Sequence, residues 1–185
     1  KITMEHISAC YHRTHPALEI IGFRFMSVFG PNEEHKGVYA NLISQFVWGM
    51  SRGEQPILYG DGTQTRDFTN VADVVQGITL AMETSKSLGN DIFNIGTGAS
   101  IAVLDLVAVI NKILGTGIRP RHIDNPVKEN YIYAQQADIT KIRSVLGFAP
   151  SVSLEEGIRR IVEQAKNRNG GSTRDRRHEA NALPI

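Results

Sequence analysis

Strand-like and helix-like segments alternate along this chain of 185 residues, and that alternation limits the folds it can adopt. Residues 19–26 and 91–95 are apolar over the length of a buried strand, and a loop or turn with glycine follows each of them. Residues 39–50 instead carry their apolar side chains at the spacing of one helical face. Because the two patterns alternate instead of forming separate blocks, the sequence predicts a mixed α/β fold.

Polar caps and glycines mark the ends of further predicted helices. Asn70 caps one helix, and Asp138 opens a short helix that Gly147 closes. Ser153 and Glu156 form a capping box for the last helix. The other expected elements, in chain order, are a helix over 2–15, a strand over 56–59, a helix over 71–84, a helix with its core face at 106–113 and an extended segment at 119–123.

The chain has a helical pattern from its second residue. Met4, Ile7 and Tyr11 line one face of the predicted helix over 2–15, and this face is either part of the core or a contact surface. The first residue is Lys1, not Met, and a helix follows directly. We therefore expect Lys1 to be an internal position of a longer protein.

The charge balance excludes several classes of partner. The 20 basic and 19 acidic residues give a net charge of +1, so the chain has no strong positive field for nucleic acid or an anionic membrane. Its apolar runs, such as 104–110, are too short to cross a bilayer. Cys10 is the only cysteine, which excludes an internal disulfide and a cysteine-based zinc site. We expect a soluble cytoplasmic protein with no nucleic-acid or membrane partner and no metal.

The composition changes after Lys166. Residues 167–185 contain Gly-Gly, dense charge and no hydrophobic period, so they bury too little apolar surface to offset the entropy of ordering. The sequence therefore predicts one folded unit over 1–166 and a disordered tail over 167–185.

The stretch 59–68, YGDGTQTRDF, has the most specific composition in the chain. Its two glycines let a backbone approach closely, and Arg66 offers a planar fork for phosphate oxygens. The same residues would also suit a hairpin turn with a solvated arginine. Asp67 and Asp73 are expected to brace the Arg66 loop and a helix start, and not to form a catalytic pair.

Four motifs carry a family resemblance: GFRFMSVFGPN, PILYGDGTQTRDFTNVADVV, FNIGTG and ADITKIRSVLGFAP. Together they resemble the extended short-chain dehydrogenase/reductase family of nucleotide-sugar epimerases and dehydratases, of the UDP-glucose 4-epimerase type. The resemblance extends from residue 1 to about residue 166. It implies the C-terminal part of an NAD-binding Rossmann-like domain, the small α/β lobe that binds the substrate, and a place in carbohydrate metabolism.

The resemblance also implies roles for particular residues. Lys1 takes the position of the lysine in the family's Tyr-x-x-x-Lys pair, because Glu5 and Tyr11 follow at the family's offsets. In the family this lysine holds the nicotinamide ribose of NAD and lowers the pKa of the catalytic tyrosine. Phe25 takes the aromatic position beside the nicotinamide. The implied substrate-binding positions are Ser27, Asn41, Leu42, Ile57, Tyr59, Arg66 and Lys128.

The implied reaction is NAD-dependent epimerisation at C4 of a UDP-hexose. Arg66, Asn41 and Lys128 would hold the diphosphate, and Ile57 with Tyr59 would hold the base. Two alternatives stay open: a nucleotide-sugar 4,6-dehydratase or decarboxylase, and a noncatalytic nucleotide-sugar-binding fragment. The glycine-rich NAD turn and the catalytic tyrosine are not in this sequence, so we expect the isolated chain to be inactive. The family also favours a homodimer through the helix over 2–15.

Overall fold

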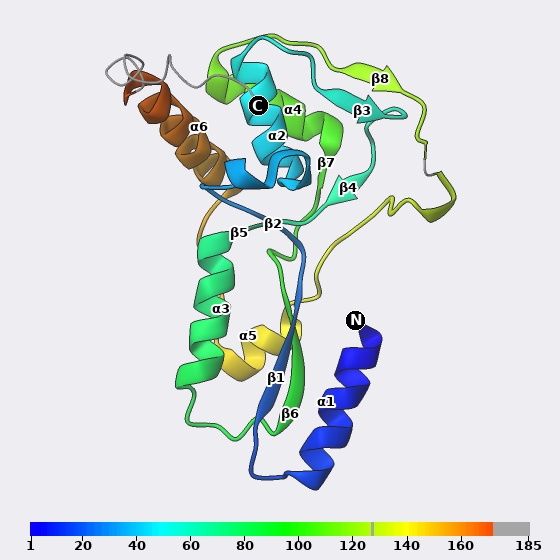
Figure 1. Ribbon diagram of the computed structural model, residues 1–185, viewed down its shortest axis with the longest axis vertical. Helices are drawn as coiled ribbons and strands as arrows, with labels where there is room; N and C mark the ends of the chain where they lie inside the picture. Colours follow the sequence, from blue (N-terminus) through cyan, green and yellow to red (C-terminus); the bar gives the residue numbers. More distant parts are fainter. Residues whose placement is uncertain (127, 172–185) are drawn as a thin grey trace, which may run out of the picture.

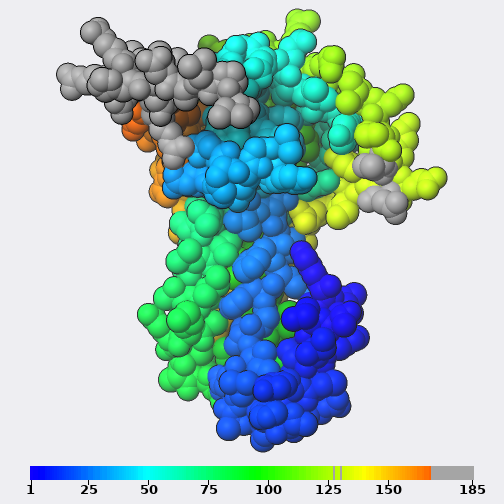
Figure 2. Space-filling model, viewed as in Figure 1, coloured from blue at the N-terminus to red at the C-terminus, as the bar shows by residue number. Residues whose placement is uncertain are grey.

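The computed structural model describes residues 1–126 and 128–171, and their elements form two lobes along one long axis (Figure 1). We name them the sheet lobe, at the bottom of the view, and the helical lobe, at the top. Figure 2 shows a narrower waist where the two lobes meet. The chain passes between the lobes more than once, so each lobe combines segments that are far apart in the sequence.

The sheet lobe is built on two parallel strands, β1 (Ile20–Phe25) and β6 (Asn90–Ile95), which pair along their whole length. Parallel strands need a long crossover, and here the crossover contains part of the helical lobe and ends in α3 (Val71–Glu83). α1 (Ile2–Thr14) lies on one side of the strands, and α3 with α5 (Thr140–Leu146) lies on the other (Figure 1). The predicted α/β fold is confirmed.

The helical lobe is a bundle of α2 (Leu42–Ser51), α4 (Val103–Leu114) and α6 (Leu154–Gly171), which pack against one another. Three short strand pairs border the bundle. They are parallel β2 (Ser27–Phe29) with β5 (Phe68–Asn70), parallel β3 (Ile57–Tyr59) with β8 (Arg121–Ile123), and antiparallel β4 (Thr65–Arg66) with β7 (Ile101–Ala102).

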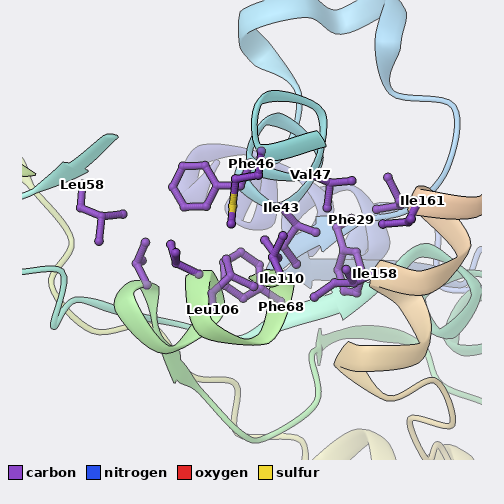
Figure 3. Packing of buried hydrophobic residues seen from close by; sticks show 14 residues of the cluster. Phe29, Ile43, Phe46, Val47, Leu58, Phe68, Leu106, Ile110, Ile158 and Ile161 are labelled. Carbon is purple, nitrogen blue, oxygen red and sulfur yellow. The ribbon is translucent and has the colours of Figure 1, made fainter. Parts of the chain in front are cut away.

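Each lobe has its own hydrophobic core. In the helical lobe, side chains from all three helices meet those of β2, β3 and β5 (Figure 3). Its buried residues are Phe29, Ile43, Phe46, Val47, Met50, Leu58, Phe68, Val103, Leu106, Val107, Ile110, Ile158, Ile161 and Val162. The core of the sheet lobe is Val74, Phe93, Ile95, Ala137, Ile139, Ile142, Leu146 and Phe148. Burying one such large side chain stabilises a fold by roughly 1.5–3 kcal/mol. Each cluster therefore stabilises its own lobe.

The predicted caps at Asn70 and Ser153 are confirmed by their hydrogen bonds, whereas the short helix predicted to open at Asp138 begins at Thr140. The Asn70 side chain accepts a bond of 3.0 Å from the backbone N–H of Ala72 at the start of α3. Ser153 Oγ accepts one of 3.2 Å from the N–H of Glu156 at the start of α6. Gly147 ends α5 with a φ of 70°, a left-handed conformation that favours glycine.

Two predicted helix boundaries are wrong. The helix predicted over 39–50 begins only at Leu42, because Asn41 caps it and residues Glu34–Tyr39 form a 3-10 helix, η1, with Gly37 at φ 52°. The last helix continues to Gly171 instead of ending at residue 166. Once a packed helix exists, each further residue adds a backbone hydrogen bond at low cost, so polar residues can extend it. The rest of the predicted tail, 172–185, lies outside the described residues.

The apolar face of α1 is not part of a core. Met4, Ile7 and Tyr11 are 67%, 53% and 49% exposed, and no residue of α1 is buried. The helix prediction over 2–15 is confirmed, but its interpretation as core is wrong within this chain. Among the described residues, no helix is both long and apolar enough to cross a membrane.

Candidate functional site

A cleft of about 940 Å³ opens in the helical lobe beside α2, β3 and β8. The predicted site residues Leu42, Ile57 and Tyr59 line it, together with Tyr131. Ile57 and Tyr59 alternate along β3 with Leu58, which is 1% exposed, packs in the core and also lines the cleft. The structure therefore brings three of the predicted substrate residues together.

Two tyrosine rings meet at this cleft. The ring of Tyr59 contacts that of Tyr131 edge to face, with 6.0 Å between their centroids. Tyr131 in turn contacts Tyr133 in the same way, at 5.3 Å. Aromatic rings in such a position offer flat apolar surfaces with polar edges, which suits a planar ring system in a ligand.

Arg66 lies beside these rings and is not freely solvated. Its side chain is half-buried, and its Cζ lies 5.3 Å from the centroid of the Tyr131 ring. Its Nη1 donates a hydrogen bond of 2.8 Å to the carbonyl oxygen of Thr65. Arg66 also lines a second cleft of about 370 Å³, together with Thr97 and residues 150–154. Because the guanidinium has further N–H groups, it can still bind an anion there.

The Arg66 loop is braced by the carboxylate that follows it. Asp67 is fully buried and accepts hydrogen bonds from the N–H and Oγ1 of Thr97, at 2.9 and 2.6 Å. Its other oxygen accepts bonds from the N–H groups of Gly98 and Ala137, at 3.0 and 3.1 Å. Asp73, also buried, lies in the first turn of α3 and accepts a bond of 2.8 Å from the N–H of Ser151. The predicted bracing roles of both aspartates are confirmed.

The loop tip ahead of Arg66 is fixed by Asp61. Its Oδ1 accepts hydrogen bonds from the N–H and Oγ1 of Thr63, at 3.0 and 2.7 Å. The bond from the Thr63 hydroxyl, followed by the one from its backbone N–H, lowers the pKa of the Asp61 carboxyl. The carboxylate form therefore holds the turn between β3 and β4 in place.

Two other predicted substrate residues have side chains engaged in the fold. Asn41 donates from Nδ2 to the carbonyl of Val28 at 2.9 Å and accepts from the N–H of Ile43 at 3.0 Å. Ser27 Oγ donates to Oε1 of Gln135 at 2.8 Å. Both side chains are half-buried, so they shape the base of the helical lobe.

Lys128 lies on the surface, in the short 3-10 helix η2 (Lys128–Asn130). Its Nζ is 4.0 Å from Oδ1 of Asp124, and both side chains are largely exposed. In the chain, Lys128 stands between Ile123 and Tyr131, which both line the 940 Å³ cleft. Because its side chain is largely exposed, Lys128 is not buried in the cleft.

Lys1 and Phe25 belong to the sheet lobe and lie apart from the substrate positions in the helical lobe. Lys1 is exposed and directly precedes α1, whose start is at the same end of the lobe as the carboxyl ends of β1 and β6 (Figure 1). Phe25 is the last residue of β1, is 47% exposed and lies 6.2 Å from the Phe23 ring. The carboxyl end of parallel strands is where open α/β sheets bind ligands.

Sequence reasoning missed the central position of Tyr131 and the burial of Glu33. Glu33 is 6% exposed and accepts hydrogen bonds from Nζ of Lys36 and the N–H of Asn41, which fixes the segment before α2. The sequence gives two signals for Tyr131. The family resemblance aligns it with the aspartate of the family's Arg-x-Gly-Asp segment, and it lies two residues from Tyr133 in an extended segment. That spacing indicates a shared face but not which partner the face meets.

These features define a class of protein. The helical lobe belongs to an α/β fold and contains a cleft with two aromatic rings, and a half-buried arginine lies beside these rings. Flat apolar surfaces next to a guanidinium suit a ligand that combines a base with phosphate groups. The fold and site therefore define an α/β protein with a cleft of this chemistry.

The comparison with protein families is more specific. The model of the NAD dependent epimerase/dehydratase family matches residues 1–96, and the chain belongs to this family. The solved UDP-glucose 4-epimerase of Thermotoga maritima, with UDP-glucose, has a TM-score of 0.82 and 32% identity over 91% of this chain and 52% of its own. The family is NAD-dependent, and the predicted fold, an α/β portion of its Rossmann-like enzymes, is confirmed.

Relatives with different reactions are similar to this chain. The UDP-glucuronate 4-epimerase of Thermodesulfobacterium geofontis is 30% identical over 88% of this chain and 47% of its own length. UDP-glucuronic acid decarboxylase 1 of Arabidopsis thaliana is 30% identical over 91% of this chain and 37% of its own length. The chain thus spans about half the length, or less, of the curated relatives it matches.

Proposed function

We propose that this chain is the substrate-binding part of an NAD-dependent enzyme that epimerises C4 of a UDP-hexose. The observation that carries the proposal is the cleft in which Tyr59 and Tyr131 lie next to the Arg66 guanidinium. Relatives whose solved structures hold UDP-glucose or UDP-glucuronic acid support the choice of ligand. The alternative with direct support is a decarboxylase, since such enzymes are 30% and 32% identical to this chain.

In this proposal the base lies against Ile57 and Tyr59 in the cleft that Leu42 also lines. Arg66 holds the diphosphate, because a guanidinium can donate two parallel hydrogen bonds to phosphate oxygens. Lys128 is exposed and close in sequence to two residues of the cleft, and we propose that it adds a second positive charge at the rim. Asn41 would act mainly through the start of α2, since its own amide already caps that helix and bonds to Val28.

The residues of this chain fit one side of a nicotinamide nucleotide. Phe25 offers an exposed ring and Lys1 an exposed ammonium group, at the same end of the sheet lobe. When bound, NAD would supply the hydride acceptor that the reaction needs. Lys1 would hold the ribose, and Phe25 would pack beside the nicotinamide. We propose no turnover for these 185 residues alone, because the catalytic tyrosine and the glycine-rich turn are not among them.

We also propose that the protein forms a homodimer and is located in the cytoplasm. The exposed apolar face of α1, with Met4, Ile7 and Tyr11, is a surface that a second copy or the rest of a longer protein would cover. The single free cysteine, Cys10, is consistent with a reducing compartment.

The test of the proposed site is titration of the chain with UDP by calorimetry. Replacing Arg66 by alanine should weaken binding by about 1.5–3 kcal/mol, or roughly 10- to 150-fold, the scale of hydrogen bonds to a charged group. Arg159→Ala, an exposed arginine on α6, is the matched control and should leave the affinity unchanged. Absence of UDP binding to the unaltered chain would contradict the proposed function, and equal affinity in Arg66→Ala would remove Arg66 from the site.

A further inference from the structure

Tyr131 lies between the two parts of the proposed site. Its ring contacts Tyr59 on the cleft side, and the Arg66 guanidinium lies over it at 5.3 Å. The Tyr131 ring therefore contacts both Tyr59, which we propose binds the base, and Arg66, which we propose binds the diphosphate. Arg66 itself faces the smaller cleft, so Tyr131 is the side chain through which it adjoins the larger one.

The backbone fixes Tyr131 relative to Arg66. The N–H of Thr65 donates to the carbonyl of Tyr133 at 2.8 Å, and the N–H of Gln135 donates back to the carbonyl of Thr65 at 3.2 Å. Residues 133–135 therefore pair with β4, the strand that carries Arg66. Because this pairing starts only two residues after Tyr131, it sets where the tyrosine ring can lie.

The interaction favours one orientation of the guanidinium. A guanidinium over an aromatic ring is attracted by the electrons of the ring face, by roughly 0.5–2 kcal/mol depending on burial. The group lies over the ring and donates from Nη1 to Thr65, which leaves its other N–H groups for phosphate oxygens. The attraction requires the ring of Tyr131 and does not require its hydroxyl group.

We propose that Tyr131 is a positioning residue that holds the Arg66 guanidinium for the diphosphate of the ligand. The inference rests on the proposed function, because it takes a nucleoside diphosphate as the ligand of this cleft. Tyr131 would thereby make the site select diphosphates over nucleosides, since its main effect passes through Arg66.

The test compares UDP and uridine as calorimetric probes of the full 185-residue chain. Tyr131→Leu should weaken UDP binding roughly 3- to 30-fold, the range of the ring–guanidinium attraction. It should weaken uridine binding less than UDP binding. Tyr131→Phe should stay within about twofold of the unaltered chain for both probes, because it keeps the ring.

A double-variant cycle separates positioning from a general loss of structure. In an Arg66→Ala background, Tyr131→Leu should change the UDP affinity by less than about twofold, because no guanidinium remains to be positioned. Tyr133→Leu is the matched control, since the ring of this tyrosine contacts Tyr131, whereas the Arg66 guanidinium lies over the Tyr131 ring. It should leave the UDP affinity within about twofold.

Three results would overturn the inference while leaving the proposed function intact. They are an unchanged UDP affinity in Tyr131→Leu, equal losses for UDP and uridine, and a loss in Tyr133→Leu as large as that in Tyr131→Leu. If the unaltered chain binds neither probe, the proposed function fails first, and the inference fails with it.

Discussion

Asp67 is a buried carboxylate that ties separate segments of the chain together next to Arg66. Four hydrogen bonds reach its two oxygens from Thr97, Gly98 and Ala137. The Asp67 side chain is 0% exposed and Ala137 is also buried, so loss of the carboxylate would leave the N–H of Ala137 without its acceptor in a buried position. The position of the Arg66 backbone therefore depends on Asp67.

Replacing Asp67 by asparagine should lower the free energy of unfolding by about 2–5 kcal/mol, because a buried NH₂ group would then face N–H donors instead of accepting from them. Urea denaturation followed by circular dichroism measures this change. Asp105→Asn, an exposed aspartate in the first turn of α4, is the control and should cost no more than about 1 kcal/mol. Equal losses in the two variants would show that the Asp67 network contributes little.

The sequence predicted that Asp67 braces its loop, but it could not predict the partners. Thr97 is 30 residues away and Ala137 is 70 residues away, so the bonds exist only after these distant segments have come together. Tyr131 is a similar case, since its contacts with Tyr59 and Arg66 join segments that no local pattern connects. Local capping at Asn70, by contrast, needs only neighbouring residues and was predicted correctly.

The attachment of α1 to β1 includes an ion pair that depends on pH. Arg24 Nε and Nη2 donate to the two oxygens of Glu5, at 2.8 and 2.6 Å. These hydrogen bonds lower the pKa of the Glu5 carboxyl. Since the pKa is lower in the folded chain than in the unfolded one, the pair stabilises the fold above the ordinary pKa of glutamate. That contribution is lost as the pH falls through the lowered pKa.

Glu5→Gln should therefore lower the melting temperature slightly near pH 7, and the difference from the unaltered chain should be smaller at an acid pH below 4.5, the ordinary pKa of glutamate. Thermal melts at a series of pH values measure this. Glu163→Gln, an exposed residue of α6, should not change the melting temperature at either pH. A difference between Glu5→Gln and the unaltered chain that persists undiminished in acid would contradict a role for the ionised pair.

Helical periodicity in the sequence predicted the helices better than it predicted their surroundings. The spacing of Met4, Ile7 and Tyr11 correctly gave a helix, but the face is exposed, because a period states that a face is apolar and not what covers it. The apolar period over 39–50 included Tyr39. The side chain of Asn41 instead caps α2, so the helix begins at Leu42 and Tyr39 lies outside it. A strong local hydrogen bond outweighed the period there.

The separation into two lobes has a consequence for how a ligand would stabilise the molecule. The two cores are distinct, and the cleft with Tyr59 and Tyr131 belongs to the helical lobe. The predicted cofactor residues, Lys1 and Phe25, belong to the sheet lobe. The sequence could predict the α/β class from its alternation, but not this division, because the segments that form each lobe are interleaved along the chain.

Hydrogen exchange with UDP should therefore give protection in the helical lobe alone. A ligand at 100 times its Kd stabilises the bound form by about 2.7 kcal/mol, so opening of the segments that hold it should slow by up to roughly 100-fold. The amides of Thr65 and Gln135 should respond most, because they join β4 to the segment after Tyr131. The amides of α1 and α5 should be unchanged, and Arg66→Ala should abolish most of the effect at the same UDP concentration. Protection that appeared at β1 and α1 instead would place the nucleotide in the sheet lobe and contradict the proposed cleft.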